Sequence, residues 1–185
     1  MADQLKNILS SQLIISFVAG LKFNNLKSFL GGYEYILRAM PTLGISSGSS
    51  PIAFYTDMNI NDNNALDILE KLGSCLRIEE DKFDAFTSIF GAGPAFISHL
   101  SNTLAKIAKE HGFEEPEPWI REILDGTSHI HKSDEKNSFE NIVDMVASKG
   151  GVTEAALNKI NEEGIEKIWN EAINDAILKS RALGD

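Results

Sequence analysis

The pattern of hydrophobic residues changes near residue 80, and this change constrains the fold more than any other feature of the chain. Before it, short apolar runs alternate with short amphipathic segments. After it, apolar residues recur only at the three- and four-residue spacing of helices. Alternating strands and helices are typical of a wound α/β sheet, whereas consecutive helices form an all-α domain. We therefore expect an α/β domain over residues 1–80 and a helical domain over residues 81–185.

The first domain contains four candidate strands. Leu13–Val18 is almost continuously apolar, so we expect an interior strand that is covered on both faces. The other candidate strands are Tyr35–Met40, Ile52–Thr56 and Cys75–Ile78. Helices are expected over Asp3–Ser10, over Asn24–Leu30, and from a cap at Asn61 or Asp62 to Leu72.

The second domain contains only helical patterns. Helices are expected over Lys82–Phe90, Pro94–His111, Trp119–Ile130 and Phe139–Val146, and from Ile165 toward the end of the chain. The last helix carries a stripe of isoleucines and Trp169, which is more apolar surface than one small helical layer can cover. A homodimer through these helices, or a higher oligomer, is therefore expected.

Composition excludes several classes of function. The net charge of −10 repels phosphate backbones and anionic membranes, so neither nucleic acid nor a membrane surface is an expected partner. The longest apolar run, Leu13–Ala19, is too short to span a bilayer. Cys75 is the one cysteine, which points to a reducing, cytoplasmic setting. His129 and His131 are two residues apart and point to different helix faces, so no metal site is expected.

A glycine-rich turn at Ser148–Thr153 separates two amphipathic helices. Thr153 and Glu154 are expected to open the second helix, and the free N–H groups of a helix start suit a carboxylate. Gly150 and Gly151 would let a ligand approach the backbone closely. From the residues alone, a plain interhelical turn capped by Thr153 is the simpler interpretation.

A second glycine-rich segment, Gly91–Ala95, precedes another predicted helix, with Pro94 as its first residue. It differs from the dinucleotide-binding fingerprint because Phe96 stands where the third glycine belongs and no predicted strand leads into it. The simplest interpretation is a tight turn that allows close helix packing.

Taken together and in order, several segments resemble the pyrroline-5-carboxylate reductase family. Ser16–Gly20 resembles Ser-Ile-Ala-Ala-Gly, Arg38–Pro41 matches Arg-Ala-Met-Pro, and Gly91–Phe96 resembles Gly-Ser-Gly-Pro-Ala-Tyr/Phe. Asp144–Val146 followed by Ser148–Thr153 resembles Asp-Met-Val followed by Ser-Pro-Gly-Gly-Thr-Thr. The segment from Glu162 to the end of the final helix also fits.

The resemblance implies part of a dinucleotide-binding, Rossmann-like sheet followed by an all-α dimerisation domain, in a mostly helical chain. The family reduces pyrroline-5-carboxylate to proline with NADPH or NADH, an oxidoreductase step of proline biosynthesis. On this resemblance, the backbone around Gly150, Gly151 and Thr153, with Ser148, holds the substrate carboxylate. The Thr153 hydroxyl contacts the ring nitrogen and is the expected catalytic group. The implied cofactor contacts, for NADP or NAD, are Ala19, Gly20, Met40 and Pro41.

The chain departs from the family pattern at several positions. It contains no Gly-x-Gly-x-x-Gly and lacks the first strands of the cofactor fold. Thr42-Leu43-Gly44 stands in place of Asn-Thr-Pro, and family residues are also replaced at Ala92, Lys149 and Val152. We therefore expect no reductase activity from this chain alone, with the cofactor half supplied by a separate dinucleotide-domain chain or a longer protein. The alternatives are a non-catalytic helical dimerisation module or imino-acid-binding remnant, and a chance likeness between unrelated helical proteins.

Overall fold

The computed structural model describes residues 11–58, 65–133 and 138–184. The helix expected over Asp3–Ser10 and the cap expected at Asn61 or Asp62 lie outside these residues. The chain forms two compact units, Met1–Phe96 with Ala172–Asp185, and Ile97–Glu171. The assignment of residues 1–80 and 81–185 to separate functional domains stays a prediction.

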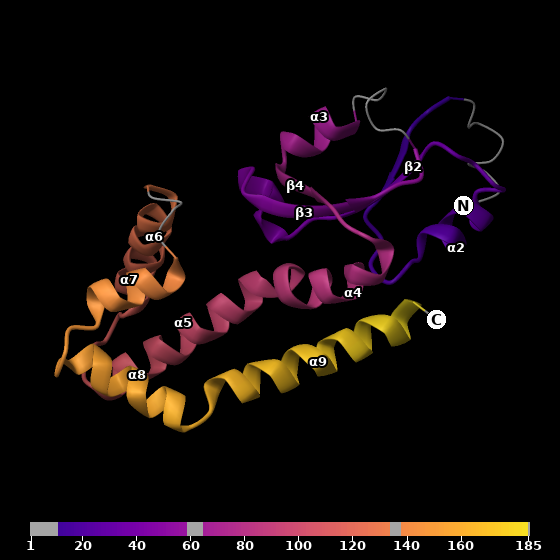
Figure 1. The fold of residues 1–185 in the computed structure, drawn as a ribbon. Coiled ribbons are helices and arrows are strands. Elements are labelled where there is room, and N and C mark those ends of the chain that lie inside the picture. Colours follow the sequence, from indigo (N-terminus) through magenta and orange to yellow (C-terminus); the bar gives the residue numbers. More distant parts are fainter. Residues whose placement is uncertain (1–10, 59–64, 134–137, 185) are drawn as a thin grey trace. The chain divides into compact units, whose positions relative to one another are not determined.

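A four-stranded mixed sheet forms the centre of the first unit (Figure 1). Its strands are β1 (Ile14–Ser16), β2 (Ile36–Met40), β3 (Ser50–Tyr55) and β4 (Gly73–Arg77), in the order β1-β2-β3-β4. β1 and β2 are parallel, as are β3 and β4, and the β2–β3 pair between them is antiparallel. A 3₁₀ helix, η1 (Leu43–Ser47), lies in the connection from β2 to β3.

Helices cover both faces of this sheet. Right-handed crossovers place α2 (Phe23–Phe29) and α3 (Ala65–Glu70) on opposite faces, because the two parallel pairs run in opposite directions. Successive side chains of a strand point to opposite faces of the sheet, so alternate residues of β2 and β3 pack into different hydrophobic cores. Leu37, Ile52 and Leu69 share one core, whereas Ile36 packs with Phe23 in another. A third core joins Ala53 to Phe83 and Phe86 of α4 (Phe83–Phe86).

The strand expected over Leu13–Val18 forms, but it is shorter than the apolar run, and it lies at the edge where the flanking strands of the cofactor fold are expected to be missing. β1 has three residues and lies at an edge of the sheet, where it pairs within the described residues with β2 alone. Phe17 and Val18, just beyond its end, are 45% and 55% exposed. The apolar run shows that a strand forms, but apolar character alone does not show how many neighbouring strands it has.

The rest of the chain is helical. The segment begins with η3 (Glu80–Lys82) and α4, which continues as a π-helix, η4 (Thr87–Gly91). The remaining helices are α5 (Gly93–Glu110), α6 (Glu117–Ser133), α7 (Phe139–Val146), α8 (Val152–Glu162) and α9 (Ile165–Gly184). This architecture confirms the expected fold class, an α/β sheet of the dinucleotide-binding type followed by helices. None of the described helices is long and apolar enough to cross a membrane.

The turn expected at Gly91–Ala95 has a different form. The chain does not break there, because the Ala92 N–H donates to the Thr87 carbonyl at 3.0 Å, the i to i+5 bond of a π-helix. The expected helix over Lys82–Phe90 therefore runs with this bulge almost to the start of α5. A side chain at Gly91 would make ordinary contacts, and one at Gly93 would meet nothing within 4 Å, so close packing does not explain both glycines.

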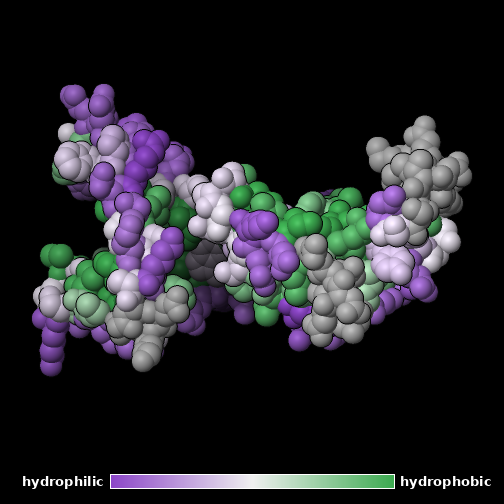
Figure 2. Space-filling model, turned by 90° about the horizontal axis from the view of Figure 1, so that it is seen from above, coloured by the Kyte–Doolittle hydropathy of each residue, from purple (hydrophilic) through white to green (hydrophobic). Residues whose placement is uncertain are grey.

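Little apolar surface is buried within the helices from α5 onward. Among the described residues of these helices, Ala105 and Ile142 are the buried hydrophobic residues. Larger side chains remain exposed, including Leu100 at 53%, Trp119 at 71% and Ile123 at 61%. Figure 2 shows hydrophobic residues reaching the surface among the hydrophilic ones in the part of the view that holds α6, α7 and α8.

Candidate functional site

The turn into α8 requires both of its glycines. Gly150 has a φ of +73°, in the left-handed region that L side chains rarely adopt. A Cβ at Gly151 would lie 2.6 Å from Ser148 Oγ and 2.8 Å from the Ser148 carbonyl oxygen. The Gly151 N–H donates to that same carbonyl at 2.8 Å. The backbone therefore folds tightly onto Ser148 just before the helix begins.

Glu154, not Thr153, makes the side-chain hydrogen bond that joins this helix to the turn before it. The N-cap position is Gly151, and the helix begins at Val152, one residue earlier than expected. The Gly150 N–H donates to Glu154 Oε2 at 2.7 Å, an arrangement like the acidic half of a capping box. Thr153 is the second residue of the helix, so the interpretation of Thr153 as the cap was wrong.

The start of α8 is suited to an anion. The N–H groups of Val152, Thr153 and Glu154 belong to the first turn, where no intrahelical carbonyl accepts them. The helix dipole adds partial positive charge at this end. Val152 is 88% exposed, so the turn is open to a ligand. The turn thus brings together the four residues expected to bind substrate, Ser148, Gly150, Gly151 and Thr153, but it engages the Gly150 and Gly151 amides internally.

The four expected cofactor contacts lie at one edge of the sheet. Ala19 and Gly20 follow β1, whereas Met40 ends β2 and Pro41 follows it. Because β1 and β2 are parallel neighbours, both segments lie beyond their carboxyl ends, where open α/β sheets bind ligands. The alternation of strand, helix and strand in the sequence is typical of such a parallel pair.

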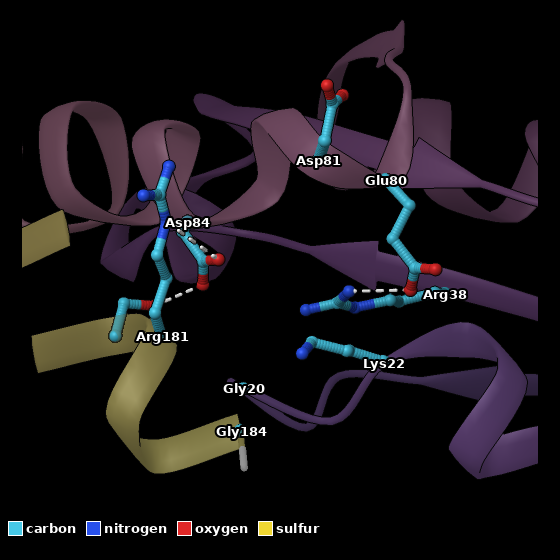
Figure 3. Close-up of a pocket in the computed structure, with 9 residues that line it drawn as sticks. Gly20, Lys22, Arg38, Glu80, Asp81, Asp84, Arg181 and Gly184 are labelled. Carbon is cyan, nitrogen blue, oxygen red and sulfur yellow. Dashed lines mark hydrogen bonds and ion pairs between the residues drawn. The ribbon is translucent and has the colours of Figure 1, made fainter. Parts of the chain in front are cut away.

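Beside Gly20, the first unit has a pocket of about 250 Å³ (Figure 3). Its charged lining residues are Lys22, Arg38, Glu80, Asp81, Asp84 and Arg181. A volume of this size is below the range of about 300–1,000 Å³ for drug-sized ligands. The described residues therefore do not fit a whole dinucleotide, although the segments after β1 and β2 could contact one end of it.

Arg38 is the central residue of this pocket. Its side chain is 6% exposed, and Nη1 donates to Glu80 Oε1 at 2.9 Å. The guanidinium carbon lies 4.2 Å from the centre of the Phe83 ring, a cation–π contact. Glu80 also accepts a hydrogen bond from the Phe23 N–H at the start of α2. Glu80 therefore joins strand β2 to helix α2 through one carboxylate.

On another wall of the pocket, the Asp84 carboxylate joins α4 to the end of α9, as Glu80 joins β2 to α2. Its carboxylate accepts a hydrogen bond from Ser180 Oγ at 2.6 Å and lies 4.0 Å from Arg181 Nε. Gly184 packs so closely on Gly20 that a Cβ on Gly184 would lie 2.3 Å from the Gly20 carbonyl oxygen. These contacts hold the end of α9 against the α/β layer.

Sequence reasoning missed this pocket. The available signal was Arg38, a lone charge within the otherwise apolar strand Ile36–Met40. A buried charge requires a partner, so such a residue predicts a nearby carboxylate. Its partner Glu80 lies 42 residues away and cannot be identified from spacing.

The remaining ionisable residues supply no further candidate. Burial raises the pKa of the Cys75 thiol, with a smaller contribution from Glu70, which lowers its reactivity as a nucleophile. Burial, followed by the charge of Asp57, also raises the pKa of Tyr55. Within the part of the chain that the structure describes, no three His, Cys, Asp or Glu residues are grouped so that they could hold a metal.

The family model described as pyrroline-5-carboxylate reductase dimerisation matches residues 80–183. The chain is 32% identical over 177 residues to the pyrroline-5-carboxylate reductase of Aquifex aeolicus, covering 92% of this chain and 66% of that protein. It is 31% identical over 172 residues to that of Staphylococcus haemolyticus, covering 90% and 63%. The chain thus spans a little less than two thirds of the length of these two relatives.

Comparison with solved structures points to the same family. The 1-pyrroline-5-carboxylate reductase of Streptococcus pyogenes superposes with a TM-score of 0.80 at 28% identity, covering 98% of this chain and 71% of that one. The pyrroline carboxylate reductase of Plasmodium falciparum, with NADP bound, superposes with a TM-score of 0.86 at 24% identity, covering 100% and 74%. This second likeness concerns the fold alone. The comparisons confirm the resemblance seen in the sequence.

Proposed function

This chain belongs to the pyrroline-5-carboxylate reductase family, and we propose that it binds the carboxylate of pyrroline-5-carboxylate at the start of α8. The observation that supports the proposal is the glycine turn before Val152, which lies within the family-matched residues 80–183. Its reaction class would be reduction of a cyclic imine to an imino acid in proline biosynthesis.

The geometry suggests how the carboxylate would bind. The Gly151 N–H already donates to Ser148, and the Gly150 N–H already donates to Glu154. The first-turn amides, beginning with Val152, would therefore make the initial contacts with a ligand. Gly150 would contribute when the Glu154 carboxylate moves aside. The Thr153 hydroxyl, in the same turn, would contact the ring nitrogen, and Ser148 would border the ligand.

We also propose that the chain is a homodimer through the helices after residue 81. The family model that matches here is one of dimerisation, and the exposed apolar side chains of α5 and α6 give a physical reason for it. Burial of apolar surface is worth about 25 cal/mol per Å². A second copy that covered these helices would remove this surface from water.

The cofactor in this family reaction would be NADPH or NADH, which supplies the hydride. Ala19, Gly20, Met40 and Pro41 would border the end of the cofactor that reaches the carboxyl ends of β1 and β2. The 185 residues contain no Gly-x-Gly-x-x-Gly turn for the diphosphate. We therefore propose that these 185 residues by themselves do not turn over substrate, and that a dinucleotide-binding half would be needed, on a separate chain or in a longer protein.

The second candidate function is a dimerisation module that binds an imino acid without catalysis. The observation that favours it is the pocket beside Gly20, whose small volume does not suit a dinucleotide. Both candidates share the binding site at α8 and differ only in turnover.

The test is an absorbance assay of NADPH oxidation by the purified chain with pyrroline-5-carboxylate. We expect no substrate-dependent oxidation from the chain alone and saturable oxidation after a dinucleotide-binding half of the same family is added. Oxidation by the chain alone would contradict the proposed need for a partner. No oxidation after the addition, with imino-acid binding retained, would favour the non-catalytic module.

A further inference from the structure

The charged pocket beside Gly20 is lined by residues other than those of the site at α8. All of its lining residues belong to the first compact unit, whereas the α8 turn belongs to the second. Its walls come from β2, α2, the η3–α4 segment and the end of α9 (Figure 3). This pocket therefore needs an explanation of its own.

The lining of this pocket contains equal numbers of positively and negatively charged side chains. Its lining contains three basic side chains, Lys22, Arg38 and Arg181, and three acidic ones, Glu80, Asp81 and Asp84. A ligand of one sign would be attracted by half of these groups and repelled by the other half. A molecule with a positive and a negative end can instead gain favourable contacts at both.

The two main charged groups are held in fixed positions. Arg38 is fixed by the Glu80 carboxylate at 2.9 Å and by the Phe83 ring at 4.2 Å. Asp84 is fixed by Ser180 Oγ at 2.6 Å and by Arg181. Groups that are already ordered lose little conformational freedom when a ligand binds. They are therefore better anchors than freely moving surface charges.

Figure 3 shows how these groups are arranged. The ends of Lys22 and Arg38 point into the same open space, and Asp84 lies across that space beside Arg181. Lys22 and the Arg38–Glu80 pair thus lie opposite Asp84, which has Arg181 beside it. At about 250 Å³, the cavity suits a molecule of amino-acid size.

We propose that this pocket binds a small zwitterion, an α-amino or α-imino acid. Its carboxylate lies toward Arg38 and Lys22, and its ammonium group lies toward Asp84. Such a ligand bridges the end of α9 and the α/β layer, because its two ends contact opposite walls. The bound ligand would thereby stabilise the first compact unit.

The test is calorimetric titration of the full chain with L-proline, which is a rigid zwitterion. Acetate and pyrrolidinium serve as probes that each carry one of its two charges. We expect two molecules of L-proline per chain, one here and one at the α8 turn. We expect Asp84→Asn to weaken the site in this pocket by about tenfold or more. Asp125→Asn, which alters an exposed acid of α6, serves as the matched control and should bind like the wild type.

The outcomes separate this proposal from the proposed function. If Asp84→Asn and the second wall variant, Lys22→Gln, both bind L-proline like the wild type, this proposal is wrong. If Thr153→Val weakens every binding event, the pocket is not a site, whereas the α8 turn is. If binding responds to Asp84→Asn alone, the α8 site is wrong. Binding of acetate or pyrrolidinium as tightly as L-proline would overturn the zwitterion assignment.

Discussion

The backbone N–H of Gly150 donates to the Glu154 carboxylate, with 2.7 Å between the nitrogen and Oε2. An internal carboxylate thus occupies part of the position proposed for the substrate carboxylate. It holds the turn in shape, but its negative charge also opposes an incoming anion.

Substituting Glu154 by Gln should therefore increase affinity for a carboxylate ligand. The amide of Gln still accepts from the Gly150 N–H, as Gln does in capping boxes, but the charge is removed. Two like charges about 4 Å apart in water repel by about 1 kcal/mol, so affinity for L-proline at this site should rise about fivefold. Calorimetry measures the change, and equal or weaker binding by Glu154→Gln would show that Glu154 does not compete with the ligand.

The Gly73→Ala variant should be severely destabilised. Gly73 has a φ of +154°, and a Cβ there would lie 1.9 Å from the Ser50 carbonyl oxygen, so β3 and β4 could not keep their pairing. We expect a loss of about 4 kcal/mol or more in the free energy of unfolding. Gly126→Ala is the control, because a Cβ there meets nothing within 4 Å in α6. It should stabilise the helix by up to about 1 kcal/mol. Urea unfolding that gave both variants similar stability would contradict the described β3–β4 register.

Removing the buried charge at Arg38 should also destabilise the first unit. Arg38→Gln leaves Glu80 without its cation, and breaking a buried pair in this way costs about 3 kcal/mol. Lys27→Gln breaks a more exposed pair with Asp57, at 3.4 Å, and should cost at most about 1 kcal/mol. Thermal unfolding followed by circular dichroism compares the two. Equal losses of stability in Arg38→Gln and Lys27→Gln would mean that the Arg38–Glu80 pair is not buried in solution.

The helices should associate through their apolar faces. Leu100→Glu places a charge on a 53% exposed leucine of α5 and should weaken dimerisation by about tenfold or more, since the charge would be buried against the second copy. Thr103→Glu places the same charge on a polar position of the same helix, and its effect should be small. Sedimentation equilibrium at micromolar concentration distinguishes the two. A monomeric wild type would contradict the proposed dimer.

The sequence was sufficient to predict most of the elements. The apolar runs at Ile36–Met40 and Phe139–Val146 correspond closely to β2 and α7, because local periodicity reports which side chains must leave water. The apolar character of Leu13–Val18 did not show where β1 ends, whereas the missing strands of the cofactor fold indicated that it would lie at an edge. Pairing between neighbours is decided by tertiary structure.

The turn before α8 was predictable in its residues but not in its hydrogen bonds. The two glycines indicated a tight turn, and the structure explains Gly151 by its contact with Ser148. The hydrogen bond from the Gly150 N–H to Glu154 was not predicted, although a glutamate at the third helical position often bonds back to the preceding backbone. The start of the helix had been placed one residue too late. The Arg38–Glu80 pair is a long-range contact and has no local signature.

The central claim is that the start of α8 binds the carboxylate of a cyclic imino acid, with Thr153 at the ring nitrogen. The measurement that tests it most directly is calorimetric titration of L-proline into the wild type and Thr153→Val, with Thr103→Val in α5 as a matched control. Loss of one hydrogen bond should weaken binding by about 1 kcal/mol, or about fivefold, in Thr153→Val alone. Equal affinity in the wild type and both variants would contradict the account and remove Thr153 from the site.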